Sequence, residues 1–507
     1  MKRVVFNYLF FAALAVSAVS TSCNKIPDVE DYKGSASITI TIGDANDIRY
    51  IISGSGAFII DWGDGIVEKG KLEPWDDLWV HHRYTDNRFS RRITISGDVT
   101  SFVLNISNLI PLTSLGVSNN NVLTTLSINF DGYHYYDIGN ITSLDISNVT
   151  ALKTLYLNGV SITDLNLSGV TAMETLDLQN VQITNLNIKN ATALKTLRID
   201  DYRHYGNDIT SLNINDAIAL TTLYLSGIHI TNLNLSGVTA LKTLDLQNIQ
   251  ITNLNISNAT ALTTLDFYDK GNTINNLNVS GATALTYLDC DIIQLKSFLL
   301  SGLTALTTFY CRDNLLGGNM IVDEKTLRWL DVSNNQLTSL DLSGATALRE
   351  LNCGNNQLTS LDVSGATALT TLSFWNNPLT SLNVSGTALT SLNVNGYYLE
   401  YLDVSGTTAL IELHCSNNQL TSLDASGATA LTTLNCSNNQ LTSLNVSGAT
   451  ALTTLNCSNN KLSFSALNAL FEMLPTANGF NVIFIDNNPG IYSCDLSIAT
   501  SKGWTVW

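Results

Sequence analysis

A motif of 21 residues repeats through most of this 507-residue sequence and constrains the fold more than any other feature. Its clearest copy, LTTLNCSNNQLTSLNVSGATA, begins at Leu431, and the motif begins again at Leu452. One such unit is too short to bury its own apolar side chains, whereas units stacked in register share a continuous core. The sequence therefore predicts a mainly β solenoid of about 16 to 17 coils over residues 100–462.

One position in each unit, which we call the column position, carries an apolar side chain flanked by polar residues. The column consists of Ile128, Leu157, Leu178, Ile199, Leu225, Leu246, Phe267, Cys290, Cys311, Val332, Cys353, Phe374, Val394, Cys415, Cys436 and Cys457. This alternation is typical of a strand with one buried face, so we expect the column side chains to point inward. We predict that its cysteines are packed thiols, because no C-x-x-C pair occurs and the cysteines after Cys23 are odd in number.

Three positions after the column, the C-terminal coils carry asparagine: Asn314, Asn335, Asn356, Asn377, Asn418, Asn439 and Asn460. A buried side-chain amide there can bond the backbone of its own turn and of the adjacent turn, which predicts a ladder of hydrogen bonds along the rod. The N-terminal coils carry Val160, Val181, Ile228, Ile249 and Ile293 at this position. We therefore expect two zones whose turns differ.

The pattern L-x-x-L-x-L/C-x-x-N-x-L resembles the leucine-rich repeat family, and the second half of each unit, as in LTSLDVSG, resembles its nested 21-residue subtype, IRREKO. The resemblance covers residues 100–462. Its likeness to bacterial surface proteins of this family implies a role in adhesion, or in contact with a host or a neighbouring cell.

At the N-terminus, Lys2 and Arg3 precede an apolar segment at residues 4–19, and small residues lead to Cys23. This arrangement resembles the signal peptide of a bacterial lipoprotein, with Ser20 in place of the usual Leu, as in the looser signals of Bacteroidetes. A core helix or a retained anchor is the alternative, but these 16 residues are fewer than the roughly 20 that span a bilayer. We expect residues 1–22 to be removed and the Cys23 tether, residues 23–35, to hold the protein at the outer membrane and the cell surface.

Residues 36–99 contain the strand-like runs SITITI, IRYIIS, AFIIDW and RRITISG, together with the sequences DWGDG and H-x-Y. These features resemble the PKD family of immunoglobulin-like β-sandwiches, in which such a domain is a spacer or adhesion unit. The glycines of DWGDG permit the positive φ of a tight turn, and Trp62 is expected to pack between the sheets. Asp61 and Asp64 could bind calcium, but they lack the spacing of a calcium loop, which favours a hydrogen-bonded turn.

Residues 463–507 are expected to cap the C-terminal end of the solenoid. The segment SFSALNALFEMLPT predicts one short helix with an apolar face, an N-cap at Ser463 or Ser465 and a stop at Pro475; the face consists of Leu467, Leu470, Phe471 and Leu474. A strand, NVIFID, follows. Trp504 and Trp507 are predicted to close the core.

Three coils are longer than 21 residues, and their added length follows the column residues Ile128, Ile199 and Phe267. Aromatic and basic side chains occupy the first two of these loops: Tyr133, His134, Tyr135 and Tyr136 in one, and Tyr202, Arg203, His204 and Tyr205 in the other. Aromatic side chains on exposed loops commonly anchor interfaces, so we interpret these residues as candidates for ligand binding. The alternative is that the loops fold back and bury their rings.

A second set of residues departs from the small polar residues that flank the column, and five of them, Tyr287, Tyr310, Arg312, Trp329 and Trp375, are further candidates for ligand binding. The whole set comprises Tyr156, Arg198, Tyr224, Tyr287, Tyr310, Arg312, Trp329, Trp375 and His414. Four of its aromatic residues, Tyr287, Tyr310, Trp329 and Trp375, fall in five consecutive coils and predict an aromatic stripe beside Arg312. Such a stripe could stack on sugar rings or receive apolar side chains of a protein partner; the alternative is a scatter of surface aromatics.

Charge and motif content limit the functional classes. The formal charge of −17 argues against nucleic acid as a partner and against direct attraction to anionic lipid, which leaves the lipid anchor as the only membrane attachment. The six histidines are dispersed, and no H-E-x-x-H, G-x-S-x-G or P-loop sequence occurs, so we expect no enzymatic activity, no metal and no cofactor.

We therefore predict a monomeric, non-enzymatic protein of the cell surface that presents its leucine-rich repeat surface to a protein partner in adhesion. Two alternatives remain open. One is a glycan-binding accessory lipoprotein in polysaccharide capture, and the other is a purely structural envelope protein.

Overall fold

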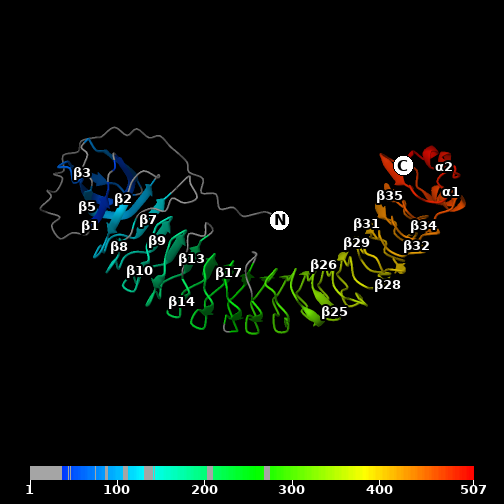
Figure 1. Ribbon diagram of the computed structural model, residues 1–507, viewed down its shortest axis with the longest axis horizontal. Coiled ribbons are helices and arrows are strands. Elements are labelled where there is room, and N and C mark those ends of the chain that lie inside the picture. Colours follow the sequence, from blue (N-terminus) through cyan, green and yellow to red (C-terminus); the bar gives the residue numbers. More distant parts are fainter. Residues whose placement is uncertain are drawn as a thin grey trace.

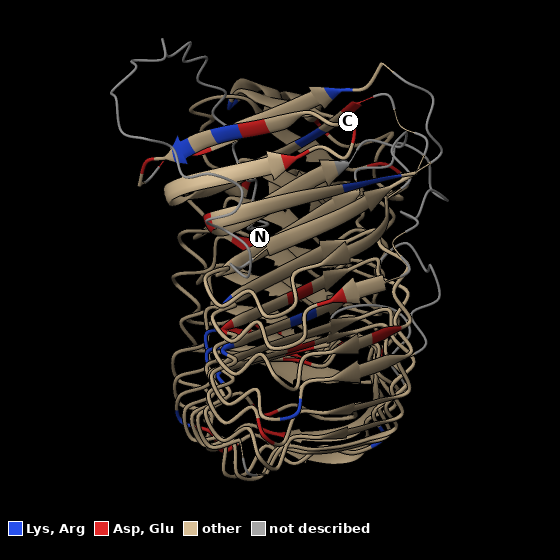
Figure 2. Cartoon of the chain, turned by 90° about the vertical axis from the view of Figure 1, so that its left-hand side faces the viewer, with Lys and Arg blue, Asp and Glu red and all other residues tan. Residues whose placement is uncertain are grey.

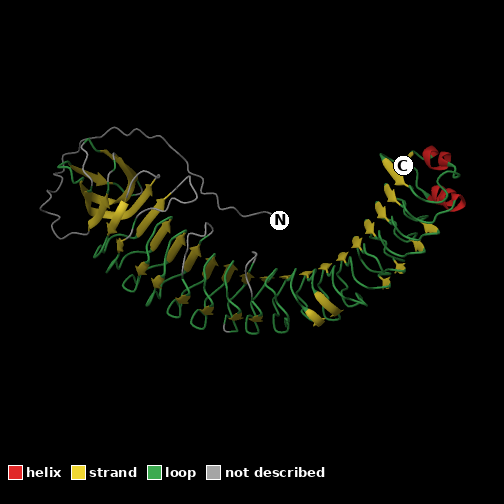
Figure 3. Ribbon diagram, in the orientation of Figure 1, coloured by secondary structure: helices red, strands yellow, loops and turns green. Residues whose placement is uncertain are grey.

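The computed structural model describes residues 37–507, except residues 44, 46, 75, 86–89, 107–111, 131–140, 142, 202–208, 258 and 268–273. The described residues form a mainly β molecule, a curved solenoid of about 18 turns with antiparallel strands at its N-terminal end and two helices at its C-terminal end (Figure 1, Figure 3). The predicted signal peptide, the Cys23 tether, and the loop candidates at 133–136 and 202–205 lie outside the described residues.

The N-terminal part is an antiparallel arrangement of β1 (Ser37–Ile42), β2 (Asp47–Asp61), β3 (Val67–Leu72), β4 (Asp77–Arg83) and β5 (Arg91–Ile106). Both β1 and β2 pair with β5, and β2 also pairs with β3 and β4. β2 runs through two segments that the sequence presents as separate strands, and its register shifts between Gly54 and Phe58. Gly56, with a φ of 121°, lets the strand bulge there instead of ending in a turn.

The DWGDG sequence forms the hydrogen-bonded turn that we expected. Asp61 Oδ1 accepts a 2.9 Å hydrogen bond from the backbone N–H of Gly63, and Asp64 Oδ1 accepts one of 2.9 Å from that of Ile66. Both glycines have positive φ, and Trp62 is buried in the core. The immunoglobulin-like assignment of residues 36–99 stays a prediction.

The antiparallel part and the solenoid share one sheet. Residues 101–106 of β5 pair in parallel with β7 (Thr125–Phe130), while β6 (Leu112–Gly116) pairs with β1 on one side and with β8 (Ser143–Asp145) on the other. β5 therefore extends past residue 100 into the first coil, and the buried side chains of both parts form one continuous core. This continuity covers the apolar N-terminal end of the solenoid.

The concave side of the arc is a parallel sheet, which we call the inner sheet (Figure 1). After β7 it contains β9 (Thr154–Asn158), β11 (Thr175–Gln179), β13 (Thr196–Asp200), β15 (Thr222–Ser226), β17 (Thr243–Gln247), β19 (Thr264–Asp266), β21 (Tyr287–Asp289), β22 (Thr308–Tyr310), β24 (Trp329–Asp331), β26 (Glu350–Asn352), β27 (Thr371–Ser373), β29 (Ser391–Asn393), β31 (Glu412–His414), β33 (Thr433–Asn435), β35 (Thr454–Asn456), β36 (Asn481–Phe484) and β37 (Trp504–Val506). Strands β7, β13 and β19, which precede the three longer loops, all belong to this sheet.

The convex side carries strands that pair two by two (Figure 3). The pairs are β10 (Asp164–Asn166) with β12 (Asn185–Asn187), β14 (Ser211–Asn213) with β16 (Asn232–Asn234), β18 (Asn253–Asn255) with β20 (Asn276–Asn278), β23 (Gly317–Ile321) with β25 (Gln336–Asp341), β28 (Ser381–Asn383) with β30 (Tyr401–Asp403), and β32 (Ser422–Asp424) with β34 (Ser443–Asn445). In most coils both halves thus contribute a strand, whereas the described residues between β21 and β22 and between β26 and β27 form no convex strand.

The column of apolar side chains is confirmed. All sixteen predicted column residues are at most 4% exposed. Strand pairing extends the column to Leu104 at the front and Ile485 at the back, and both are buried. With these two additions, the number of column residues matches the roughly 18 turns of the solenoid. The six column cysteines are free and buried, as expected for packed thiols.

The asparagine ladder is also confirmed. Asn439 is typical: its side-chain NH2 group donates to the carbonyl of Cys415 in the preceding coil at 2.9 Å and to that of Cys436 in its own coil at 3.0 Å. Its Oδ1 accepts a 3.1 Å hydrogen bond from the backbone N–H of Leu420. Each such amide therefore ties two neighbouring coils together inside the core.

The C-terminal cap contains the predicted helix, α1 (Phe464–Met473), with Ser463 as its N-cap. A second helix, α2 (Leu496–Ser501), follows β36 and precedes β37. The prediction for Trp504 is confirmed, since it is buried and its indole N–H donates to Pro475 O at 2.7 Å. The prediction for Trp507 is wrong: its backbone extends the pairing with β36, which leaves its side chain 61% exposed. No helix among the described residues has the length and apolarity needed to cross a membrane.

The ladder predicts a large effect of a small substitution. We expect Asn439→Ala to lower the free energy of unfolding by about 1–3 kcal/mol, because buried carbonyl and N–H groups in two coils lose their partner. Urea denaturation measures this change. The exposed Ser447→Ala serves as the control and should change stability by less than about 0.5 kcal/mol. Equal stability of the two variants would contradict a role for the ladder.

The column predicts the reactivity of the thiols. Burial raises the pKa of Cys415 and of Cys457 to about 12, so almost no thiolate forms at pH 8. We expect iodoacetamide to leave all six column cysteines unmodified in the folded protein and to modify them after unfolding in urea, as read by mass spectrometry. Half-buried Cys494 is the internal reference. Column cysteines that react in the folded protein as fast as Cys494 would show that the coils are not packed.

Candidate functional site

The structure describes five of the thirteen predicted ligand-binding candidates: Tyr287, Tyr310, Arg312, Trp329 and Trp375. All five are half-exposed and belong to strands of the inner sheet or directly follow one. Because the neighbouring leucines and column residues point into the core, these side chains face the concave side. The concave face is therefore where the described candidates gather.

Parallel pairing in register arranges the residues just before the column into a line across the inner sheet. We call eight of them the acidic row: Asp177, Arg198, Tyr224, Asp245, Asp266, Asp289, Tyr310 and Asp331, one from each of eight successive strands. Neighbouring strands lie about 4.8 Å apart, so these side chains stand next to each other along the row. Three consecutive strands, β17, β19 and β21, each contribute an aspartate to the row.

The predicted aromatic stripe occupies several lines. Tyr287 and Trp329 lie in one line with Thr308 between them, whereas Tyr310 belongs to the acidic row. The rings of Tyr287 and Tyr310 meet edge to face, with their centroids 6.1 Å apart. Trp375 lies three strands away from Arg312 along a further line, and so it forms a separate feature.

Arg312 is held against the acidic row by Asp291. Its Nε donates to Asp291 Oδ2 at 2.7 Å, and the buried Asp291 carboxylate also accepts from the backbone N–H of Arg312. The guanidinium lies 5.7 Å from the centre of the Tyr310 ring. Burial and Asp289 raise the pKa of Tyr287, whose hydroxyl donates to Asp289 Oδ2 at 3.3 Å. The centre of the concave face is thus a connected polar and aromatic surface.

Arg198 forms a similar group nearer the N-terminus. Its guanidinium donates to Asp200 Oδ2 at 2.7 Å and lies 4.6 Å from the centre of the Tyr224 ring. Arg198 Nε also lies 3.9 Å from Asp177 Oδ1. Arg198 and Arg312 therefore already have carboxylate partners, and neither is paired with Asp245 or Asp266 in the row.

The aspartates between these arginines are electrostatically crowded. Burial, followed by the charge of Asp266, raises the pKa of Asp245 to about 7. Burial, followed by the charge of Asp291, raises the pKa of Asp289 to about 7. Desolvation and like charges both disfavour the ionised form of a carboxyl group. With pKa values near 7, Asp245 and Asp289 are only partly ionised at neutral pH, and a cation placed beside them would favour their charged form.

Sequence reasoning missed the aspartates of the acidic row. Acids also recur at Asp341, Asp362, Asp403 and Asp424, but these lie on or beside the convex strands and accept backbone N–H bonds in their own turns. The signal for the row was present in segments such as YLDCD and WLDVS, where Asp directly precedes the column. Reading each register position along successive coils would have found it.

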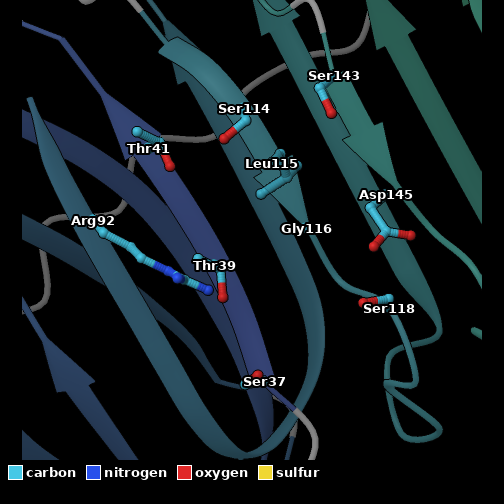
Figure 4. Close-up of a pocket in the computed structure, with 10 residues that line it drawn as sticks. All are labelled: Ser37, Thr39, Thr41, Arg92, Ser114, Leu115, Gly116, Ser118, Ser143 and Asp145. Atoms are coloured by element: carbon cyan, nitrogen blue, oxygen red, sulfur yellow. The ribbon is translucent and has the colours of Figure 1, made fainter.

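A separate polar hollow of about 330 Å³ lies where the N-terminal strands join the solenoid (Figure 4). Hydroxyl-bearing side chains of β1, β6 and β8 line it, and Arg92 reaches over β1 toward Thr39. It has no aromatic side chain among its lining residues.

Nowhere in the described ranges do three or more His, Cys, Asp or Glu residues converge in a way that could hold a metal ion. Charged residues are sparse over the chain as a whole (Figure 2).

Part of the solenoid matches a known repeat family. Residues 325–365 and 408–448 match the family model described as Leucine Rich repeats (2 copies). No curated protein matches the chain. The two matched segments lie in the zone of the asparagine ladder.

Several solved structures are similar to this chain. The functional domain of InlJ from Listeria monocytogenes, which includes a cysteine ladder, shares 27% identity with a TM-score of 0.48, over 64% of this chain and 74% of that one. An internalin, inlF, from Listeria monocytogenes shares 18% identity with a TM-score of 0.34, over 80% and 86%. The ectodomain of the Arabidopsis receptor kinase HAESA, in complex with a peptide hormone, shares 20% identity with a TM-score of 0.42, over 76% and 78%.

The raised pKa values predict how stability depends on pH. A carboxyl whose pKa is higher in the folded than in the unfolded state contributes stability at low pH, and this contribution is lost as pH rises from about 4 through about 7. We expect Asp245→Asn/Asp289→Asn to be more stable than the wild type at pH 8, by on the order of 1 kcal/mol after solvent screening, and about equally stable at pH 4.

Thermal unfolding at both pH values measures this difference. Asp341→Asn is the matched control, because a backbone hydrogen bond from Ser343 lowers the pKa of Asp341. It should be less stable than the wild type at pH 8. A double variant that loses stability at pH 8 would contradict the crowding of the acidic row.

Proposed function

We propose that this leucine-rich repeat protein is a non-enzymatic binding protein of the cell surface, anchored in the outer membrane through a lipid on Cys23, and that it recognises a protein partner with its concave face. Adhesion to a host or a neighbouring cell is the role proposed for it. The acidic row is the centre of the proposed binding surface, together with Tyr287, Arg312 and Trp329. Tyr133–Tyr136 and Tyr202–Tyr205 are proposed to extend it.

The observation that carries this proposal is the run Asp245, Asp266 and Asp289 on three adjacent strands. The central surface, consisting of Asp177, Asp200, Asp245, Asp266, Asp289, Asp291, Asp331, Arg198 and Arg312, has seven carboxyl groups and two guanidinium groups, or −5 when all are ionised. A partner with Lys or Arg side chains would complement this net negative charge. Complementary charge of this kind raises association rates and selects between partners.

The tyrosines beside the aspartates support a protein partner over a simple cation. Tyr224 and Tyr310 interrupt the acidic row, and Tyr287 packs against Tyr310. Half-exposed aromatic rings provide contact area that is already ordered, and such residues are enriched among those that carry binding energy. A basic segment with apolar side chains between its charges fits this alternation. The purely structural alternative gives no reason for the crowded carboxylates.

A binding experiment with a defined probe tests the proposal. We expect a peptide of alternating Lys and Leu to bind the protein in biolayer interferometry, and a peptide of alternating Glu and Leu not to bind. Asp245→Asn/Asp266→Asn/Asp289→Asn should weaken binding of the basic peptide at least tenfold. Affinity should also rise from pH 6 to pH 8, because Asp245 and Asp289 ionise over this interval.

A matched control separates the acidic row from the overall negative charge. Asp341→Asn/Asp362→Asn/Asp424→Asn removes the same three charges from the convex side and should leave binding of the basic peptide nearly unchanged. Equal losses in the two triple variants would show that only net charge attracts the peptide, and the proposed surface would then be wrong.

A further inference from the structure

The large side chain of Trp375 packs against a glycine in the preceding coil, and both residues depart from the repeat. It occupies the position just after the column, where neighbouring coils carry Ser333, Gly354, Asn395 and Ser416. A Cβ atom on Gly354 would lie within 2.3–2.6 Å of three atoms of the indole. The ring therefore lies directly over the Gly354 backbone, and any other residue at position 354 would displace it. The glycine at position 354 and the tryptophan at position 375 are therefore sterically complementary across adjacent coils.

The next coil departs from the repeat at the same place. Phe374 and Val394 are 20 residues apart instead of 21, and Tyr397 replaces the asparagine of the ladder. The residue just before the ladder position is Asn376, Gly396 and Asn417 in three successive coils. Asn376 and Asn417 have φ values of 54° and 58°, whereas Gly396 does not adopt this left-handed conformation. The altered turn leaves the Tyr397 side chain 66% exposed.

These changes open a hollow of about 470 Å³, which we call the tryptophan notch. Its lining consists of Trp375, Asn376, Asn393, Asn395, Gly396, Tyr397 and Asn417. The volume lies within the range usual for small-ligand sites. Two aromatic rings and four carboxamides surround it, and none of the lining residues carries a charge.

The four carboxamides are held by the coils in complementary orientations. Asn393 and Asn395 accept backbone N–H bonds through Oδ1, from Asn395 at 3.2 Å and from Ser416 at 2.7 Å. Asn376 and Asn417 donate through Nδ2, to Asn355 at 2.7 Å and to Ser416 at 3.3 Å. Two NH2 groups and two carbonyl oxygens thereby remain for a ligand in this described part of the chain.

We propose that the tryptophan notch binds a neutral hexopyranose ring of a glycan. One face of such a ring presents C–H groups and packs on an aromatic side chain, while its hydroxyls both donate and accept hydrogen bonds. A charged ligand would lose water with no opposite charge in the notch, and a purely apolar side chain would leave four amides unpaired. A sugar ring can satisfy the aromatic rings and the amides together.

This site is independent of the proposed protein-binding surface. Along its own line of the inner sheet, Trp375 is separated from Arg312 by Ser333 and Gly354, and neighbouring strands lie about 4.8 Å apart. The acidic row ends at Asp331 on β24, before β27 and β29, whose coils form the notch. Substitutions in one surface should therefore leave the other intact.

Saturation-transfer NMR with the methyl glycosides of glucose, galactose and mannose tests the proposal on the whole chain. We expect at least one of these sugars to bind the wild type. Tyr397→Asn should weaken this binding at least tenfold, and because it restores the asparagine of the repeat, the fold should be preserved. Trp375→Ala should abolish the signal, whereas Trp329→Ala, on the same sheet outside the notch, should leave it unchanged.

The possible results separate the two proposals. The triple variant of Asp245, Asp266 and Asp289 should bind the sugar as the wild type does, whatever its effect on the basic peptide. Binding of none of the three glycosides overturns the sugar site, and so does equal binding by the wild type and Tyr397→Asn. Loss of sugar binding in Trp329→Ala but not in Trp375→Ala would place the sugar on the aromatic residues of the central face and overturn the notch.

Discussion

The stacking of coils in register is the constraint on which the rest of the structure depends. Parallel pairing joins each strand of the inner sheet to the equivalent residues of the next coil, and the column side chains fill the space between them. Residues about 21 positions apart in sequence thereby become neighbours at the spacing of hydrogen-bonded strands. A substitution that is harmless in one coil can create a charged or aromatic surface when it occurs in several.

Register also decides the chemistry of identical residue types. Asp341, beside a convex turn, accepts the backbone N–H of Ser343 and has a lowered pKa. Asp289, on the inner sheet, is buried beside another carboxylate and has a raised pKa. A hydrogen bond to the ionised form stabilises it, whereas burial and like charge destabilise it. The same side chain is therefore a structural cap on one side of the rod and a crowded charge on the other.

The fold could be predicted largely from the sequence because the same pattern recurs in many coils and supports the same inference in each of them. Sixteen column residues and the role of Asn439 followed from period and polarity alone. The central site was predicted in part: Tyr287, Tyr310 and Arg312 stood out as exceptions to the motif. The acidic row and Tyr397 did not stand out, because Asp is common in the motif and a shortened coil changes the register by only one residue. Their meaning depends on contacts between coils, as does the exposure of Trp507, whose backbone pairs with β36.

The central claim is that alignment across coils crowds the aspartates of the acidic row, and direct titration of individual carboxyl groups tests it most closely. NMR of protein labelled with ¹³C at the aspartate carboxyl carbons, assigned with single Asn variants, would follow Asp245, Asp289, Asp341 and Asp362 between pH 3 and pH 9. The account predicts midpoints near 7 for Asp245 and Asp289, and midpoints below the ordinary value for Asp341 and Asp362. Four midpoints near the ordinary aspartate value of about 3.9 would contradict it.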